Sequence, residues 1–344
     1  MLRLSNKQFL IIAAILMAVI FISLSIWFYL QNKNSSLEVE NATLSLENTE
    51  TALRHPLSGH KISATQFDFF PVSVMIDNGY DISYFAGLDK AHIVYEALVE
   101  ANITRILAIF DSQTELEKIG PVRSARSYFM DWAQEYGGAY LHVGGSPQAL
   151  AVIDDYDFIH IDQIGSGQIY FDRDESLDAP HNVFTNSKHI SRLKEWKQIA
   201  TTSVDFLPWN FVDIKDNNLP DPPNFIVNFS SENYQVEWRY SQSLRVYQRW
   251  RNQEKQISDK GEQLKADNVI IQIAPSTLID AERRAIDTES GGELIVYNCF
   301  GKNTGTWEKN GQRTEFFDSN HQPMALIPGQ TWIEVVDSAE KVLE

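Results

Sequence analysis

The most apolar part of the chain is an uncharged run from Phe9 to Leu30. About 20 apolar residues are enough for a helix to cross a bilayer. The run ends in Trp27, Phe28 and Tyr29, and aromatic side chains collect at membrane–water interfaces. A cleaved signal peptide usually has a shorter apolar core and small residues at its cleavage site. We therefore predict that residues 9–30 form an uncleaved transmembrane signal anchor.

The charges on the two sides of this run predict its orientation. Arg3 and Lys7 precede it, whereas the charged residues that follow are mainly acidic. Basic flanks stay on the cytoplasmic side, so we expect residues 1–8 to be a cytoplasmic tail and the remainder to be extracytoplasmic. Residues 31–63 are polar and rich in Asn, Ser, Thr and Glu, which is typical of a tether. The predicted localisation is the cell membrane, with a single N-terminal span.

Short apolar runs alternate with helical patterns over residues 64–205. Phe70–Ile76 predicts a buried strand that ends in the turn Asp77-Asn78-Gly79, and Tyr140–Val143 predicts another strand. Two segments have apolar residues at helical spacing, the second of them over residues 187–200. This alternation predicts a first soluble domain of mixed α/β structure.

Two apolar runs between residues 92 and 110 predict a β-hairpin with Ala101-Asn102 at its turn. The hairpin brings two carboxylates, Glu96 and Glu100, close to Arg105. Paired carboxylates can act as general acid and base. In an extended strand they would lie about 13 Å apart at ~3.3 Å per residue, which exceeds the ~5–9.5 Å separation of glycosidase carboxylates. A two-carboxylate hydrolase is therefore disfavoured for this pair.

The rest of the chain has the pattern of strands. Residues 206–223 are rich in proline and read as a linker. After them apolar residues alternate with polar ones, as at Val236, Trp238 and Tyr240, and helical spacing is scarce. We predict a β-rich antiparallel second domain over residues 224–337, with its aromatic residues in the core rather than stacked on sugars. The predicted fold class is α+β, with an N-terminal membrane helix.

Composition excludes several classes of protein. The net charge of −17 argues against nucleic acid as a partner, because phosphate binding needs basic patches. Cys299 is the single cysteine, so neither an intramolecular disulfide nor a multi-cysteine metal site can form. The sequence contains no His-x-x-x-His or His-Glu-x-x-His pattern, so we expect no metal and no cofactor.

The segment 120–126, Gly-Pro-Val-Arg-Ser-Ala-Arg, is the strongest candidate for a ligand site. Gly120-Pro121 reads as a turn, and the apolar periodicity that follows predicts a helix. Arg123 and Arg126 would then share a face near the helix start and would suit a carboxylate or phosphate. The alternative is structural pairing of each arginine with an acidic neighbour, namely Glu96, Glu100 or Asp111.

Other polar residues lie at predicted strand ends. Asp77 either contributes to a site at the end of its strand or caps its own turn. Gly144 and Gly145 would allow a close approach to the backbone, whereas Ser146, followed by proline, is better explained as a helix N-cap than as a nucleophile. His181 is the best single candidate for proton transfer, since histidine titrates near neutral pH.

Several ordered motifs identify a family. The segments PVSVMIDN, GLDKAHIVYEALVEANITRILAIF, EKIGPVRSARSYFMDWAQEYGGAYLHVGGSPQA and APHNVFTN, followed by ADNVIIQIAP, occur in this order. Over residues 69–336 the chain resembles the YerB-like family of bacterial putative lipoproteins, which have two consecutive domains of unknown function. Members commonly carry an N-terminal lipidation cysteine, which this chain lacks. The chain also has Ala101-Asn102 where the family tends to have Gly-Gly.

The sequence favours a membrane-anchored binding or envelope-scaffold protein, with a cell-wall glycan, a peptide or a partner protein as ligand. The alternative is a cell-wall hydrolase or lyase with Glu96, Glu100 and His181 as catalytic groups and Arg123 and Arg126 as electrostatic stabilisers. A third possibility is a structural subunit in which these groups form a buried network. The predicted ligand-binding residues are Asp77, Asn78, Arg105, Arg123, Arg126, Gly144, Gly145, Ser146, His181 and Asn182.

Overall fold

The structure is a computed structural model that describes residues 53–63, 69–82, 84–198, 206, 208–215 and 219–344, together with Trp27. The chain divides into two compact units, residues 1–53 and 54–344, and the following description concerns the second unit. Apart from Trp27, the predicted anchor lies outside the described residues. Among the residues that are described, none of the helices has the length and apolarity needed to span a bilayer.

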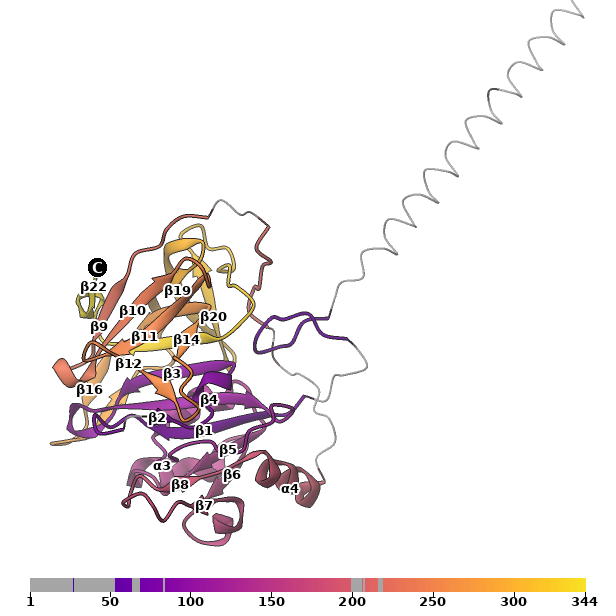
Figure 1. The fold of residues 1–344 in the computed structure, drawn as a ribbon, viewed down its shortest axis with the longest axis vertical. Helices are drawn as coiled ribbons and strands as arrows, with labels where there is room; N and C mark the ends of the chain where they lie inside the picture. Colours follow the sequence, from indigo (N-terminus) through magenta and orange to yellow (C-terminus); the bar gives the residue numbers. More distant parts are fainter. Residues whose placement is uncertain are drawn as a thin grey trace, which may run out of the picture. The chain divides into compact units, whose positions relative to one another are not determined.

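A ten-stranded sheet runs through the second unit and takes strands from both halves of the sequence (Figure 1). Its strand order is β20-β19-β18-β15-β21-β3-β4-β1-β5-β6. The strands from the first half are β1 (Pro71–Asp77), β3 (Ile93–Leu98), β4 (Thr104–Asp111), β5 (Ala139–His142) and β6 (Ile159–Asp162). Those from the second half are β15 (Asn268–Ile273), β18 (Gly292–Asn298), β19 (Gly301–Asn310), β20 (Arg313–Asp318) and β21 (Thr331–Val336).

The two halves meet where β21 pairs with β3 in parallel. β21 also pairs in parallel with β15, whereas β15–β18, β18–β19 and β19–β20 are antiparallel. The second half is β-rich, as expected, and its strand pairs β15–β18, β18–β19 and β19–β20 are antiparallel, but the parallel pairings of β21 depart from that expectation. The physical reason is burial: every residue of β21 is buried, as is usual for strands in the interior of a mixed sheet. An apolar strand of this kind needs a partner on each side, since an exposed edge would promote aggregation.

The β3–β4 hairpin is present as predicted, with Ala97 opposite Arg105. Its turn is longer than Ala101-Asn102, because Val99 and a short 3₁₀ segment, η3 (Glu100–Asn102), follow the last residue of β3. Ala101 and Asn102 have φ values of 55° and 57°, which explains why glycine suits this turn. Glu100 consequently lies outside the strand that carries Glu96, so the two carboxylates do not share a strand face.

Three α-helices are described in the first half, namely α2 (Ser127–Gln134), α3 (Pro147–Val152) and α4 (Ser187–Lys197). The predicted capping role of Ser146 is seen directly, since its Oγ accepts a hydrogen bond from the N–H of Ala149 at 3.2 Å. α2 buries its apolar face on the sheet, where Trp132 stacks on Tyr95 with ring centroids 4.9 Å apart. α2 thus covers part of the sheet formed by the first half of the sequence.

A smaller six-stranded sheet belongs to the second half. It has the order β12-β11-β10-β9-β22, with β14 paired to β11. Its strands are β9 (Phe225–Asn228), β10 (Gln235–Ser241), β11 (Val246–Arg251), β12 (Glu254–Lys255), β14 (Lys265–Ala266) and β22 (Val342–Leu343). It packs on the large sheet, since Trp238 of β10 meets Trp332 of β21 edge to face at 5.3 Å. Both rings are fully buried, in keeping with a core role.

Shorter strand pairs complete the unit. β2 (Tyr84–Phe85) pairs in parallel with β13 (Ile257–Ser258), which adds another contact between the halves. The other pairs are antiparallel and join β7 (Asp172–Arg173) to β8 (Val183–Phe184), and β16 (Ser276–Leu278) to β17 (Arg284–Ile286). In the predicted linker, Trp209 and Phe211 are buried, so this part of the segment is packed into the fold.

Candidate functional site

The segment 120–126 lies beside the carboxyl ends of two parallel strands, β1 and β5, and forms backbone hydrogen bonds with β1 and with the residues just after β5. The N–H of Arg123 donates to the carbonyl of Met75 at 2.9 Å, and the carbonyl of Arg123 accepts from the N–H of Val143 at 3.0 Å. The N–H of Ala125 donates to the carbonyl of Gly144 at 2.9 Å. The carboxyl ends of parallel strands are a frequent place for binding sites in α/β proteins, so the predicted location is structurally suitable.

The predicted helix begins later than expected. α2 starts at Ser127, with Arg126 at its N-cap position. Arg123 is therefore outside the helix, and the prediction that both arginines share a helical face is wrong. The reason is that the backbone of residues 121–125 is already paired with the neighbouring strands and cannot adopt helical hydrogen bonding.

Asp77, Arg123 and His181, which we name the surface cluster, lie at the end of β1. One oxygen of Asp77, Oδ2, lies 2.6 Å from Nδ1 of His181 and 2.9 Å from Nε of Arg123. The other oxygen accepts a hydrogen bond from the N–H of Gly79 at 3.1 Å, so Asp77 also caps its turn. Asp77 is buried, whereas the side chains of Arg123 and His181 are 20% and 29% exposed.

Backbone pairing explains how His181 reaches a residue so distant in sequence. The N–H of Val122 donates to the carbonyl of Val183 at 2.7 Å, which places β8 beside the 120–126 segment. Asp77 holds Nδ1 of His181 and therefore directs Nε2 away from it, to 3.8 Å from Oδ2 of the exposed Asp81. A histidine held in this way can exchange a hydrogen bond or a proton with a ligand.

Arg126 pairs with Glu100, as the structural alternative predicts. Its Nε donates to Oε2 of Glu100 at 2.9 Å, its Nη2 contacts Oε1, and Nη2 of Arg105 lies 3.5 Å from the same Oε1. Burial raises the pKa of Glu100, but the charges of Arg105 and Arg126 outweigh it and bring the pKa below its ordinary value. Glu100 is therefore a carboxylate at neutral pH and is poorly suited to act as a general acid.

Arg105 lies next to the Arg126–Glu100 pair, on its buried side. It is buried, and its Nη1 donates to the carbonyl of Ser124 at 3.2 Å. Burial, together with the charge of Arg126, lowers the pKa of Arg105 to about 10, so the guanidinium still carries its charge at neutral pH. Both Arg105 and Arg126 are thus engaged within the protein, and Arg123 is paired with Asp77, a partner that the sequence did not suggest.

Two other predicted site residues lie in a separate network, which we name the buried cluster: Asn78, Glu96, Arg249, Arg251 and Glu334. The amide of Asn78 donates to Oε1 of Glu96 at 2.7 Å and accepts from Nη1 of Arg251 at 3.0 Å. The other oxygen of Glu96 pairs with Nη2 of Arg249. The side chains of Glu96 and Arg249 are 1% and 0% exposed, so a ligand cannot reach either of them.

Glu334 was not among the predicted residues. It lies opposite Glu96 in the β21–β3 register, and its Oε1 accepts a hydrogen bond from Nε1 of Trp238 at 2.8 Å. Burial and the charge of Glu96 raise the pKa of Glu334 well above its ordinary value, so this group holds its proton to a higher pH than an exposed glutamate does. The signal for it was a lone acidic residue inside the apolar run Thr-Trp-Ile-Glu-Val-Val, since buried charges need partners.

The remaining predicted residues divide between backbone and surface roles. The N–H of Gly144 donates to Oδ1 of Asp162 at 2.7 Å, so the backbone of Gly144 is occupied within the protein. Asn182 lies beside His181 and accepts a hydrogen bond from Nη1 of Arg173 at 2.8 Å. Arg173, an exposed residue, was missed because nothing in its local sequence distinguishes it. Gly145 forms a backbone bridge to Ala125.

Comparison with known proteins places these features in a family. Residues 57–200 match the family described as "Protein of unknown function (DUF3048) N-terminal domain", and residues 225–333 match the corresponding C-terminal domain. The chain belongs to the DUF3048 family. "Putative lipoprotein YerB" of Bacillus subtilis (strain 168) is 30% identical over 300 residues, covering 85% of this chain and 88% of the relative. The YerB-like resemblance predicted from the motifs is thereby confirmed.

A solved structure has a similar fold. The crystal structure of the YerB protein from Bacillus subtilis aligns with a TM-score of 0.76 and 28% sequence identity. The alignment covers 85% of this chain and 99% of the crystallised chain. The parts matched by the N- and C-terminal DUF3048 domains both contribute strands to the ten-stranded sheet.

Proposed function

We propose that this protein is an extracytoplasmic binding protein of the cell envelope, anchored by a single span over residues 9–30. Its ligand is an anionic group, a carboxylate or a phosphate, on a cell-wall polymer or peptide. The lipoprotein designation of the Bacillus subtilis relative supports a position at the membrane. The surface cluster at the ends of β1 and β5 is the site that we assign to the ligand.

The observation that carries this proposal is the placement of donors around a buried carboxylate. The buried carboxylate of Asp77 contacts both Arg123 and His181, while the side chains of Arg123 and His181 remain partly exposed to solvent. Arg173 adds a third donor, because it donates a hydrogen bond to Asn182, the neighbour of His181. On the other side of His181, Nη1 of Arg123 lies 3.4 Å from the carbonyl of Pro180. Donors fixed in advance bind an anion with a smaller loss of side-chain entropy.

The positive charge of Arg173 is also available to a ligand. Within the described ranges its guanidinium bonds the neutral amides of Asn182 and Gln163, at 2.8 and 3.2 Å, and forms no ion pair. A ligand carboxylate or phosphate would therefore gain a charge-assisted hydrogen bond without displacing an internal one. Exposed Tyr80 and Ile164, each 65% exposed, provide apolar surface for the rest of the ligand.

Titration of the purified full chain tests this function. The probes are a cell-wall stem peptide with free carboxylates, poly(glycerol phosphate) and the neutral sugar chitotriose, each followed by calorimetry and thermal shift. We expect binding of one anionic probe that weakens as salt is added. Substitution Arg173→Gln should weaken it about tenfold, the equivalent of ~1.4 kcal/mol.

Arg192→Gln is the matched control, since Arg192 is an exposed arginine of α4, outside the surface cluster. It should leave the affinity unchanged. Failure of both anionic probes to bind, or equal affinities for wild type and Arg173→Gln, would contradict the proposed site. Comparison of the two anionic probes distinguishes a peptide carboxylate from a polymer phosphate.

The Asp77–His181 contact of 2.6 Å favours a second candidate function, hydrolysis of an envelope polymer. An aspartate that orients the imidazole leaves Nε2 able to activate water. Incubation of muropeptides with wild type and with His181→Gln tests this alternative. Product formation by wild type that is lost in His181→Gln would support an enzyme, and the absence of product with wild type would leave binding as the function.

A further inference from the structure

A pocket lies at the amino ends of β1 and β5, opposite to the ends that carry the surface cluster. It encloses about 460 Å³, within the ~300–1,000 Å³ range of small-molecule sites. Gly138 shapes one wall, because its φ is +72° and a Cβ at this position would lie 2.0 Å from the carbonyl oxygen of Pro71. The glycine lets the loop before β5 pass against the start of β1 and leaves the space beside it open.

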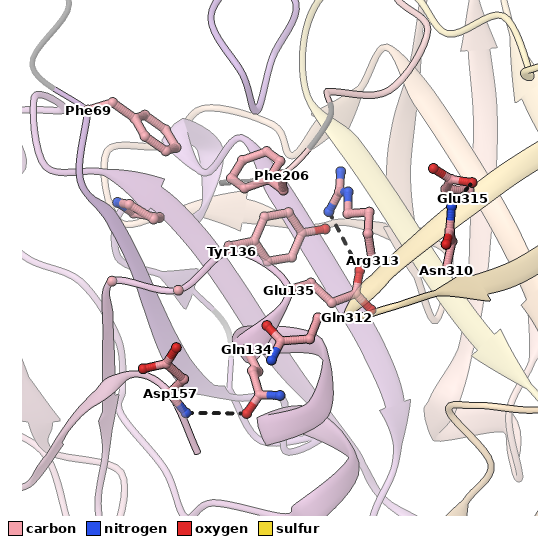
Figure 2. Close-up of a pocket in the computed structure, with 13 residues that line it drawn as sticks. Phe69, Gln134, Glu135, Tyr136, Asp157, Phe206, Asn310, Gln312, Arg313 and Glu315 are labelled. Atoms are coloured by element: carbon pink, nitrogen blue, oxygen red, sulfur yellow. Dashed lines mark hydrogen bonds and ion pairs between the residues drawn. The ribbon is translucent and has the colours of Figure 1, made fainter. Parts of the chain in front are cut away.

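Aromatic rings and one buried arginine form the inner wall (Figure 2). The guanidinium of Arg313 lies 4.7 Å from the ring centre of Tyr136, 5.0 Å from that of Phe206 and 4.4 Å from that of Trp209. Arg313 is 7% exposed, so its guanidinium is largely shielded from water. The rings stabilise this cation through their π faces.

Glu135 balances the charge of this wall. Its carboxylate lies 3.5 Å from Nη1 of Arg313 and 2.8 Å from Nζ of Lys309, and it accepts hydrogen bonds from the N–H and the hydroxyl of Thr314. All of these groups are buried or nearly so. The inner wall is therefore held in place and does not present an unpaired anion to the cavity.

The mouth of the pocket has a different chemistry. Figure 2 shows Gln134 and Asp157 on one side and residues of the β19–β20 hairpin on the other. The hairpin contributes Asn310, Gln312 and Glu315. Amides donate and accept hydrogen bonds and carboxylates accept them, whereas the negative charges of Asp157 and Glu315 would repel an anion. The mouth therefore suits an uncharged ligand that is rich in hydroxyl or amide groups.

We propose that this pocket binds a pyranose unit of a neutral glycan. The apolar face of the sugar ring would lie on the half-buried ring of Phe206, and its hydroxyl groups would bond the amides and carboxylates of the mouth. This arrangement combines a flat aromatic surface with a few polar groups that fix orientation, which is the usual composition of small-ligand sites. The site is separate from the anion site proposed above, and it does not depend on it.

Calorimetric titration of the full chain with chitotriose and with maltotriose, in a detergent without a sugar headgroup, tests the proposal. We expect at least one sugar to bind, with an affinity that changes little between low and moderate salt because the ligand is neutral. Gln312→Ala and Asp157→Ala should each weaken binding about fivefold, the effect of one lost hydrogen bond. Both positions are exposed, so neither substitution should affect folding.

Gln168→Ala is the matched control, because Gln168 is an exposed glutamine that does not line the pocket; it should leave the affinity unchanged. Arg173→Gln should also leave sugar binding intact, which separates this pocket from the anion site. The proposal is overturned if wild type binds neither sugar up to millimolar concentration, or if Gln312→Ala and Asp157→Ala bind as tightly as wild type.

Discussion

Two neighbouring residues, Asp77 and Asn78, belong to charged clusters that differ in their access to solvent. Asp77 anchors the surface cluster, in which His181 and Arg123 remain partly exposed. Asn78 belongs to the buried cluster, where the Glu96–Arg249 pair is closed to water. Both clusters contain a carboxylate at a strand, an arginine and a polar partner, so residue types alone do not distinguish a binding site from a structural contact.

The difference lies in which parts of the chain are joined. The buried cluster links β3 of the first half to β11 of the second, since Arg249 reaches Glu96 and Arg251 reaches the carbonyls of Gly79 and Ile82 at 3.1 Å. The surface cluster joins segments within the first half only. We infer that the buried cluster fixes how the two halves pack, whereas the surface cluster is available for a ligand.

The largest expected effect follows from breaking the buried pair. Arg249→Met should lower the free energy of unfolding by about 3–5 kcal/mol, because it leaves Glu96 buried without its cation. Denaturant unfolding followed by tryptophan fluorescence measures this change. Arg239→Met is the matched control in the adjacent strand, where Arg239 pairs with Glu237 at the surface, and it should cost about 1 kcal/mol or less. Equal losses in the two variants would mean that the buried cluster does not stabilise the fold.

The second prediction concerns Glu334, whose pKa is raised in the folded protein. In the unfolded chain this carboxyl group loses its proton near its ordinary pKa of 4.5, whereas in the folded protein the raised pKa keeps the proton bound to a higher pH. The folded state therefore holds more protons above pH 4.5, and the free energy of unfolding should fall with rising pH by up to ~1.4 kcal/mol per unit.

Glu334→Gln should remove this part of the pH dependence, because glutamine resembles the protonated acid and does not titrate. Its stability relative to wild type should increase between pH 5 and pH 8, measured by denaturant unfolding at each pH. Glu308→Gln, a substitution at an exposed position, should retain the wild-type slope. The same slope in wild type and Glu334→Gln would show that Glu334 is ionised in the folded protein.

Local sequence patterns were enough to predict strands, turns and a helix cap, but they did not predict which distant residues these elements contact. The apolar run of β1, the β3–β4 hairpin and the Ser146 cap followed from residues close in sequence. The Arg249–Glu96 pair spans 153 positions and the His181–Asp77 contact spans 104, and neither leaves a periodic signal. The pocket walls come from Tyr136, Phe206 and Arg313, whose proximity depends on the shared sheet. Sequence patterns therefore predict strands and turns, whereas the pairing of the two halves determines the sites.

The smallest effect should come from the surface cluster itself. Asp77→Asn removes the ion pair with Arg123 and weakens the hydrogen bond to His181, so we expect a loss of about 1–3 kcal/mol in the free energy of unfolding. This is less than for Arg249→Met because water can solvate the two released side chains. Asp81→Asn, a matched change at an exposed aspartate in the same loop, should stay within ~0.5 kcal/mol of wild type. A loss for Asp77→Asn as large as that for Arg249→Met would mean that the surface cluster also fixes the fold, and the distinction between the two clusters would no longer hold.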